Sequence, residues 1–397
     1  METVPLADFA PYSDDIRIAA VEAGDDQALV TWTDGRRSSF HYLWLRDNCH
    51  CTDCKHPQTF ERTFDLLSVP EDVSPAELSV TSGGALRAVW PDGGHESLYH
   101  PGWLDAHDYS SNPSARLRPP PELWDATLND ALPAVDCRDV MQSDAGLLHW
   151  LHLLRNRGFA LLRGVPTEPG EVRKVAERVA FARETNFGRV FDVVAMADPN
   201  SNAYTSLPLP LHVDLPTREY QPGYQFLHCI QSEAEGGSSV LMDGFAMAEA
   251  LRREDPAAFE LLSGEPVLLR FQDTEVDYRV RRPVIVTGGD GAVSEIRFTP
   301  FLADAFDVAS EKMPAYYRAY RKLMALSRDP SLQLRFRLKP GEMMTFDNRR
   351  VLHGRDAFQA GTGARHLQGC YVDHDEVDSK ILFLERTIQA TSVAAAE

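Results

Sequence analysis

Three residues have the types and the spacing of a metal site: His212, Asp214 and, much further along the chain, His353. In an extended segment the side chains of residues i and i+2 point to the same side, so His212 and Asp214 can face one cavity while Val213 packs behind them. Two imidazoles and one carboxylate on one side of a metal hold non-haem Fe(II) and leave positions open for a cosubstrate and O2. The pattern therefore predicts an iron site. The alternative is three unrelated residues with structural roles.

An arginine downstream strengthens this prediction. The run Asp347–Arg355 contains His353, and Arg365 follows it. A guanidinium is a rigid fork of donors that binds a carboxylate through two hydrogen bonds. A third ligand followed by such an arginine suits 2-oxoglutarate, whose far carboxylate Arg365 would hold. We therefore predict chemistry in which iron, 2-oxoglutarate and O2 oxidise an unactivated C–H bond and release succinate and CO2.

Three cysteines in one short segment form a second candidate metal site: Cys49, Cys51 and Cys54. A tetrahedral zinc site needs a fourth ligand, and His95 is the best candidate. His50 lies between two of the cysteines and would point away, while His56 precedes a proline and is the runner-up. A closed Cys3His set predicts a structural zinc site; three reduced cysteines without metal are the alternative. The isolated Cys137, Cys229 and Cys370 lie in apolar contexts typical of core thiols.

Composition limits the partners. The chain has 397 residues, 43% of them hydrophobic, and a formal net charge of −19. This charge argues against nucleic acid and anionic membranes, which need a basic surface, and it is compatible with a cationic substrate. We find neither a transmembrane stretch nor the apolar region of a secretory signal, and we therefore expect a cytoplasmic protein.

The elements that must position these residues fall into two parts. Residues 28–32 and 38–40 flank the turn signal Asp34-Gly35 and predict a hairpin, and a similar unit recurs at 86–90 and 95–99. A polar, proline-rich stretch ends at Pro119-Pro120-Pro121. We predict a β-rich zinc-binding domain at 1–112 and a catalytic domain at 113–397.

The second part mixes strands and helices, which predicts a mainly β protein with helices (α+β). Short strands with metal ligands at their ends suit a double-stranded β-helix, or jelly-roll, with an open mouth. We expect His353 in a loop just past a strand. Helices are predicted near 147–154, 171–182, 246–255 and 314–328, and strands at 158–164, 224–231, 238–243, 267–271, 284–287, 296–299, 332–338 and 343–346.

Both candidate sites on one chain, in this order, resemble the gamma-butyrobetaine hydroxylase family, which includes trimethyllysine hydroxylase. The resemblance covers nearly the whole chain. It runs through residues 44–49, 90–92, 202–205, 212–214, 227–229, 243–245 and 347–355. It implies an N-terminal zinc domain, a jelly-roll with iron and 2-oxoglutarate, an expected stimulation by ascorbate, and a homodimer.

The resemblance also implies roles for residues. His212, Asp214 and His353 would bind iron. Arg365 and Leu227 would bind 2-oxoglutarate. The zinc ligands would be Cys49, Cys51, Cys54 and His95. A cage of aromatic rings for a trimethylammonium group would comprise Phe187, Phe191, Tyr204 and Tyr371.

The chain departs from the family pattern at the other end of the substrate. Two asparagines that would recognise a carboxylate appear here as Ser201 and Thr299, although a one-residue shift would bring in Asn202. The usual tryptophan of the Asp-Asn-Trp-Arg motif is Arg349. No acidic residue stands where the lysine-specific enzyme would bind an α-amino group, which counts against trimethyllysine.

We therefore predict an Fe(II)/2-oxoglutarate hydroxylase of a small trimethylammonium compound, first gamma-butyrobetaine, giving carnitine. Hydroxylation of 2-(trimethylammonio)ethylphosphonate is the first alternative. A non-catalytic metal-binding or sensor protein on the same fold is the second. An oxygenase of a taurine-like or arylalkanoate substrate is a third, but it gives no reason for the zinc domain or the aromatic residues.

Overall fold

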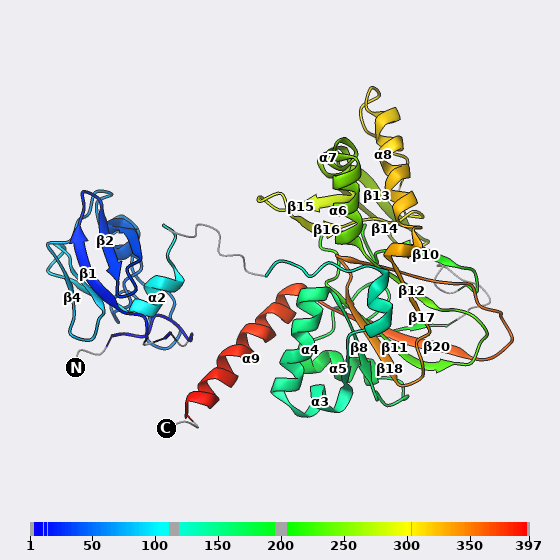
Figure 1. Cartoon of the computed structure of the whole chain (residues 1–397), viewed down its shortest axis with the longest axis horizontal. Helices are drawn as coiled ribbons and strands as arrows, with labels where there is room; N and C mark the ends of the chain where they lie inside the picture. The colour runs from blue at the N-terminus through cyan, green and yellow to red at the C-terminus, as the bar shows by residue number, and fades with distance from the viewer. Residues whose placement is uncertain are drawn as a thin grey trace. The chain divides into compact units, whose positions relative to one another are not determined.

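The structure is a computed structural model that describes residues 4–10, 12–13, 15–110, 119–194, 205–302 and 304–394, with side chains as far as residue 388. The chain divides into two compact units (Figure 1): residues 1–117 with 389–397, and residues 118–388. The predicted boundary at 112/113 falls within residues 111–118, which lie outside the described residues. None of the described helices combines the length and the apolar character needed to cross a bilayer.

The first unit is built on two three-stranded antiparallel sheets, β1-β2-β3 and β4-β5-β6. Alternate residues of β2 point inward, and Trp32 joins Phe40, Trp90 and Tyr99 in the core. The predicted hairpins are β2–β3 and β5–β6. The elements of this unit are β1 (Ile18–Ala23), β2 (Gln27–Trp32), β3 (Arg37–His41), α1 (Tyr42–Asp47), η1 (Leu66–Ser68), β4 (Glu77–Val80), β5 (Leu86–Val89), β6 (Glu96–Tyr99) and α2 (Pro101–Ala106).

The second unit contains two main sheets, in the strand orders β7-β8-β18-β11-β20-β9 and β10-β19-β12-β17, and two hairpins, β13–β14 and β15–β16. Its strands are β7 (Ala134–Asp136), β8 (Phe159–Arg163), β9 (Phe191–Val193), β10 (Leu209–His212), β11 (Tyr224–Ser232), β12 (Ser239–Asp243), β13 (Val267–Gln272), β14 (Asp277–Arg282), β15 (Ile285–Thr287), β16 (Val293–Ile296), β17 (Gln333–Phe336), β18 (Glu342–Asp347), β19 (Val351–Arg355) and β20 (Arg365–Val372).

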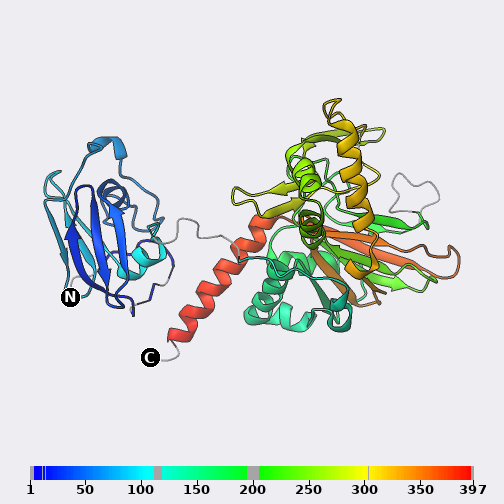
Figure 2. The ribbon, with the colours of Figure 1, turned by 45° about the horizontal axis from the view of Figure 1, so that its top comes forward.

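Helices cover both outer sides of this unit (Figure 2). One group packs on the six-stranded sheet, and α6, α7 and α8 pack against the four-stranded sheet and the β15–β16 hairpin. The first group comprises α3 (Cys137–Gln142), α4 (Asp144–Arg157), α5 (Glu171–Val179) and α9 (His374–Ala394); the second comprises α6 (Gly244–Glu254), α7 (Pro256–Gly264) and α8 (Met313–Leu326). Two short 3-10 helices, η2 (Ala126–Ala131) and η4 (Pro330–Leu332), complete the unit.

The alternation of a strand explains how the interior forms. Along β11, Phe226 packs toward the helices, whereas Leu227 and Cys229 pack between the two sheets, together with Leu241 of β12. Residues 224–230 of β11 are all buried, so both faces of this strand are covered although its sequence mixes apolar and polar residues. The predicted jelly-roll with accompanying helices is confirmed.

Several predicted elements need correction. His353 lies inside strand β19 and not in a loop. The strand expected at 296–299 is displaced to Val293–Ile296, because its pairing with β15 ends at the Ile285–Ile296 pair. The next residue, Arg297, donates to the carbonyls of Pro216 and Arg218. Helix α9 was not predicted, although Val377, Ile381 and Leu384 recur at helical spacing and are buried in the core.

Candidate active site

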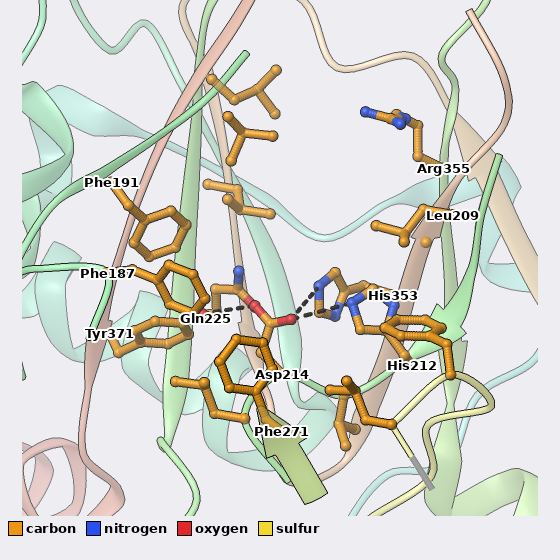
Figure 3. A pocket seen from close by; sticks show the side chains of 18 of the residues that line it. Phe187, Phe191, Leu209, His212, Asp214, Gln225, Phe271, His353, Arg355 and Tyr371 are labelled. Atoms are coloured by element: carbon orange, nitrogen blue, oxygen red, sulfur yellow. Dashed lines mark hydrogen bonds and ion pairs between the residues drawn. The ribbon is translucent and has the colours of Figure 1, made fainter. Parts of the chain in front are cut away.

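Antiparallel pairing brings the three predicted iron ligands together. His212 ends β10, and its register partner on β19 is His353. Their ring centroids lie 4.3 Å apart. Asp214 follows two residues later, with Oδ1 3.2 Å from His212 Nε2 and 3.6 Å from His353 Nε2 (Figure 3). One atom from each side chain lies within 4.8 Å of the others, a separation that suits ligands of one metal ion.

The protonation states also fit a metal. His212 Nδ1 lies 2.9 Å from the carbonyl oxygen of Pro210, which can only accept, so in the neutral ring Nδ1 carries the proton and Nε2 the lone pair. Burial, and then the His212 ring, lowers the pKa of His353 to about 3, which keeps this imidazole neutral at neutral pH. Burial alone would raise the pKa of Asp214, but the neighbouring rings of His353 and His212 and a hydrogen bond from the Tyr371 hydroxyl outweigh it and hold that pKa well below its usual range. Two imidazole nitrogens and an ionised carboxylate are the donor set that Fe(II) takes in facial sites.

Asn348 holds the backbone of the His-x-Asp segment. Its Oδ1 accepts from the Asp214 N–H at 2.7 Å, and its Nδ2 donates to the Asp214 carbonyl at 2.9 Å. Asn348 is fully buried. The next residue in the segment, Leu215, has a φ of 51°, a left-handed conformation that is costly for a branched side chain. The two-way clamp therefore supports a locally strained turn beside the metal ligands.

The two arginines after Asn348 fix the entry into β19. Arg350 and Asp243 form a buried ion pair at 2.7 Å, and Asp243 also accepts from the N–H of Phe245 at the start of α6. Arg349, which replaces the family's tryptophan, donates to the carbonyl of Gln221 at 2.6 and 2.9 Å. The departure at position 349 thus has a structural role here, and it anchors the loop between Asp214 and β11.

A cavity of about 590 Å³ opens above the three ligands. Its walls come from both sheets and from the β13 hairpin. The residues that line it are Phe187, Phe191, Val193, Thr205, Leu209, His212, Val213, Asp214, Leu215, Thr217, Gln225, Leu227, Ser239, Arg270, Phe271, Gln272, Phe301, Leu302, Met344, His353, Gly354, Arg355, Arg365, Leu367 and Tyr371.

Arg365 makes one part of this cavity cationic. It begins β20, and burial above all lowers the pKa of its guanidinium. Among the described residues no carboxylate pairs with Arg365; its recorded neighbour is the ring of Phe358, 5.5 Å away. A largely desolvated cation without an internal partner is a suitable site for a ligand carboxylate. Leu227, the other residue predicted to bind 2-oxoglutarate, lines the same cavity.

Aromatic rings form another wall. Phe191 lies 5.3 Å from Tyr371 and 6.4 Å from Phe187, between ring centroids. Phe191 faces Gly369 in the β9–β20 pair, where a Cβ would come within 2.5 Å of its ring. The glycine therefore makes room for the ring. Figure 3 shows Phe187, Phe191 and Tyr371 on one side of Asp214.

Not every predicted contact is on the cavity wall. Tyr204, Ser201 and Asn202 lie outside the described residues. Thr299 is 1% exposed, and it is not one of the residues that line the cavity. Two residues further on, Phe301 does line the cavity, and its ring lies 5.0 Å from the His212 ring.

Some wall residues were missed by the sequence analysis. Phe271 of β13 extends the aromatic wall, with its centroid 6.4 Å from that of Phe187. Gln225 of β11 is 2% exposed, lines the cavity, and has a side-chain oxygen without a hydrogen-bond partner among the described residues. Gln225 stands two residues before Leu227, so the period of a strand would have placed both on one face.

The first unit brings the predicted zinc ligands together. His95 Nε2 lies 3.3 Å from Cys49 Sγ and 3.6 Å from the sulfurs of Cys51 and Cys54. One soft sulfur from each cysteine and one imidazole complete a tetrahedral donor set.

The two rival histidines have other roles. The His50 ring packs against Trp103 at 4.4 Å, as expected for a side chain that points away from the cluster. His56 Nδ1 accepts from the backbone of Gln58 and Thr59. Neither belongs to the four-residue group.

Comparison with known proteins agrees with this geometry. The family described as taurine catabolism dioxygenase TauD, TfdA matches residues 116–371, and the one described as gamma-butyrobetaine hydroxylase-like, N-terminal, matches residues 20–105. Gamma-butyrobetaine dioxygenase of Pseudomonas sp. is 48% identical over 96% of this chain and 100% of the relative. The human enzyme of that name is 32% identical over 94% and 98%.

Human mitochondrial trimethyllysine dioxygenase is 31% identical over 85% of this chain and 81% of its own length. The chain belongs to the TauD/TfdA family of iron- and 2-oxoglutarate-dependent dioxygenases, and within it to the group of gamma-butyrobetaine and trimethyllysine dioxygenases.

Proposed function

We propose that this protein hydroxylates a small trimethylammonium compound, with gamma-butyrobetaine as the preferred substrate and carnitine as the product. The observation that carries the proposal is the arrangement of one cavity: the His-Asp-His cluster, a wall of aromatic rings, and Arg365, which pairs with no carboxylate of the described residues. The 48% identity to a gamma-butyrobetaine dioxygenase supports the choice of substrate.

The aromatic wall supports a cationic substrate. Elsewhere in the chain, arginines lie over the rings of Phe64, Phe245 and Phe259. Among the described residues no such cation lies over Phe187 or Phe191. Each ring that faces a quaternary ammonium contributes about 0.5–2 kcal/mol, and the carboxylate of Asp214 adds a favourable charge nearby.

Each group in the cavity has a task in this proposal. His212, Asp214 and His353 hold iron, which supplies the activation of O2 needed to oxidise an unactivated C–H bond. Arg365 binds the far carboxylate of 2-oxoglutarate, and Phe187, Phe191 and Tyr371 orient the trimethylammonium group. Leu227, Met344 and Leu367 form apolar walls that exclude water from the reacting atoms. In the first unit, Cys49, Cys51, Cys54 and His95 hold a structural zinc ion.

A turnover assay tests the proposal. Iron-loaded protein receives 2-oxoglutarate and, separately, gamma-butyrobetaine, 2-(trimethylammonio)ethylphosphonate, trimethyllysine or taurine, with succinate and hydroxylated product measured by mass spectrometry. We expect coupled hydroxylation with gamma-butyrobetaine. Preference for the phosphonate would support the site for the trimethylammonium group, but it would mean that the substrate carries a phosphonate and not a carboxylate. Preference for taurine would overturn the cation site, and iron-loaded protein without succinate formation would favour the sensor alternative.

We also propose a cytoplasmic homodimer with a domain division near residue 112. The homodimer rests on family resemblance, and light scattering on the purified chain tests it. A monomeric mass at micromolar concentration would contradict it.

A further inference from the structure

The two oxygens of the Asp214 carboxylate are used differently. Oδ1 faces both histidines, 3.2 Å from His212 Nε2 and 3.6 Å from His353 Nε2. Oδ2 accepts a hydrogen bond of 2.7 Å from the hydroxyl of Tyr371. Figure 3 shows these contacts on opposite sides of the carboxylate. One oxygen is therefore directed to the metal position, and the other is held by a phenol.

The Tyr371 hydroxyl is held firmly in place. Tyr371 is 2% exposed and lies in β20, where Gln225 of β11 is its register partner. Its carbonyl accepts from the N–H of Arg183 at 2.8 Å, and its ring packs 5.3 Å from that of Phe191. Two strands and an aromatic neighbour thus fix the ring. The hydroxyl can reach Asp214 without reorganisation of the backbone.

We propose that Tyr371 is a positioning residue for the iron site, and not only a ring of the cation wall. Its hydroxyl donates a hydrogen bond to Oδ2, so that Asp214 binds the metal through Oδ1 alone. This inference rests on the proposed role of Asp214 as an iron ligand, and it deepens that proposal by linking the cation wall to the metal through one side chain.

The Tyr371 hydroxyl matters because it affects how many coordination positions of the metal the Asp214 carboxylate occupies. A carboxylate that binds through both oxygens takes two positions on a metal, and one that binds through a single oxygen takes one. A facial site needs its remaining positions for 2-oxoglutarate and O2. A charge-assisted hydrogen bond to the second oxygen favours single-oxygen binding and also fixes the orientation of the carboxylate.

The test separates the hydroxyl of Tyr371 from its ring. Tyr371→Phe keeps the ring and removes the hydroxyl. Co(II) is titrated into full-length protein that keeps its zinc and lacks iron, without substrate, and gamma-butyrobetaine binding to the same iron-free protein is measured by calorimetry. We expect Tyr371→Phe to weaken Co(II) binding about tenfold, the lower range for loss of a group that orients a ligand, with little change in gamma-butyrobetaine binding.

Phe191→Leu is the matched control. It removes one ring of the wall and leaves the hydroxyl of Tyr371 and the carboxylate of Asp214 in place. We expect weaker gamma-butyrobetaine binding, by about threefold to tenfold, and unchanged Co(II) affinity. The Co(II) titration involves no substrate, so it tests Tyr371 even if the turnover assay rejects a trimethylammonium substrate.

A double-mutant cycle shows whether the hydroxyl acts through Asp214. In an Asp214→Ala background, adding Tyr371→Phe should leave the residual Co(II) affinity unchanged. An equal loss in both backgrounds would overturn the inference, as would Co(II) affinity of Tyr371→Phe equal to that of the wild type. A lower melting temperature of iron-free, zinc-containing Tyr371→Phe with unchanged Co(II) affinity would assign the hydroxyl to stability alone and overturn the inference as well.

Discussion

The two metal clusters of this chain differ in what surrounds them more than in the distances between their ligands. In the first unit, four donors surround one point, and Arg46 donates to Cys54 Sγ at 3.3 Å from outside the set. In the second unit, three donors lie on one side of a point, and a cavity of about 590 Å³ occupies the other side. A closed set of soft ligands can only hold a fold together, whereas an open set of harder ligands can admit reactants.

The neighbouring charged and aromatic groups repeat this difference. Beside the closed cluster, Arg46 pairs with Asp92 at 2.7 Å and lies 4.0 Å from the Phe64 ring centroid. Its charge is therefore satisfied within the protein. Beside the open cluster, within the part of the chain that the structure describes, Arg365 has no carboxylate partner and Phe187 has no cation over its ring. Beside the proposed structural site, the arginine and the aromatic ring interact with other groups of the protein. Beside the proposed binding site, the corresponding groups are left for a ligand.

The largest expected effect is loss of the closed cluster. Cys54→Ser should remove zinc and unfold the first unit, because structural zinc contributes about 10–16 kcal/mol of apparent binding energy in zinc-finger peptides. Metal analysis should show no zinc, and calorimetry should show loss of one unfolding transition. Cobalt binding at the His-Asp-His cluster of the same variant serves as the control. Zinc retained at full stoichiometry would contradict the ligand assignment.

Removal of a ligand from the open cluster should abolish turnover but leave the zinc and the stability of the first unit intact. Loss of a group that only orients a metal ligand lowers activity by about 10–100-fold, so loss of the ligand itself in His353→Ala should reduce turnover by more than about 100-fold. The zinc content and the unfolding transition of the first unit should stay unchanged. Succinate formation and metal analysis on the same samples check this. If His353→Ala also released zinc, the two clusters would not be independent.

Arg365 should matter for one reactant only. Arg365→Ala leaves a carboxylate of bound 2-oxoglutarate without its partner, a loss of about 2–5 kcal/mol, so the KM for 2-oxoglutarate should rise at least about 30-fold. Arg335→Ala is the matched control, since Arg335 pairs at the surface with Asp356 and such pairs contribute about 0–1 kcal/mol. An unchanged KM in Arg365→Ala would remove Arg365 from the cosubstrate site.

The smallest effect concerns the aromatic rings. Phe187→Leu should weaken binding of the trimethylammonium substrate about threefold to tenfold and leave the melting temperature nearly unchanged. Phe64→Leu should lower the stability of the first unit and leave substrate binding unchanged, because the ring of Phe64 already carries Arg46. Calorimetric binding and melting curves of both variants test the contrast. Equal effects on both measurements would mean that Phe187 is only a packing residue.

The sequence analysis was strongest where ligands are close in the chain. Cys49, Cys51 and Cys54 are local, and His212 and Asp214 follow the period of a strand, so residue type and spacing were sufficient to predict which side chains come together. It was weaker for residues whose position depends on strand pairing. His353 was expected in a loop, yet it is the register partner of His212 within a sheet. Phe271 came to the wall through the β13 hairpin, which no local pattern relates to the iron ligands.

The sequence by itself determined which chemistry is available, through residue types and short spacings. It contains two sets of donor atoms, an arginine after the third predicted iron ligand, and several aromatic residues. Tertiary structure decided how these groups are used. Only the pairing of β11 with β20 directs Gln225 and Tyr371 into one cavity, and only the fold places the Tyr371 hydroxyl on Asp214 Oδ2. Contacts between residues far apart in the chain depend on register and packing, which short-range patterns do not contain.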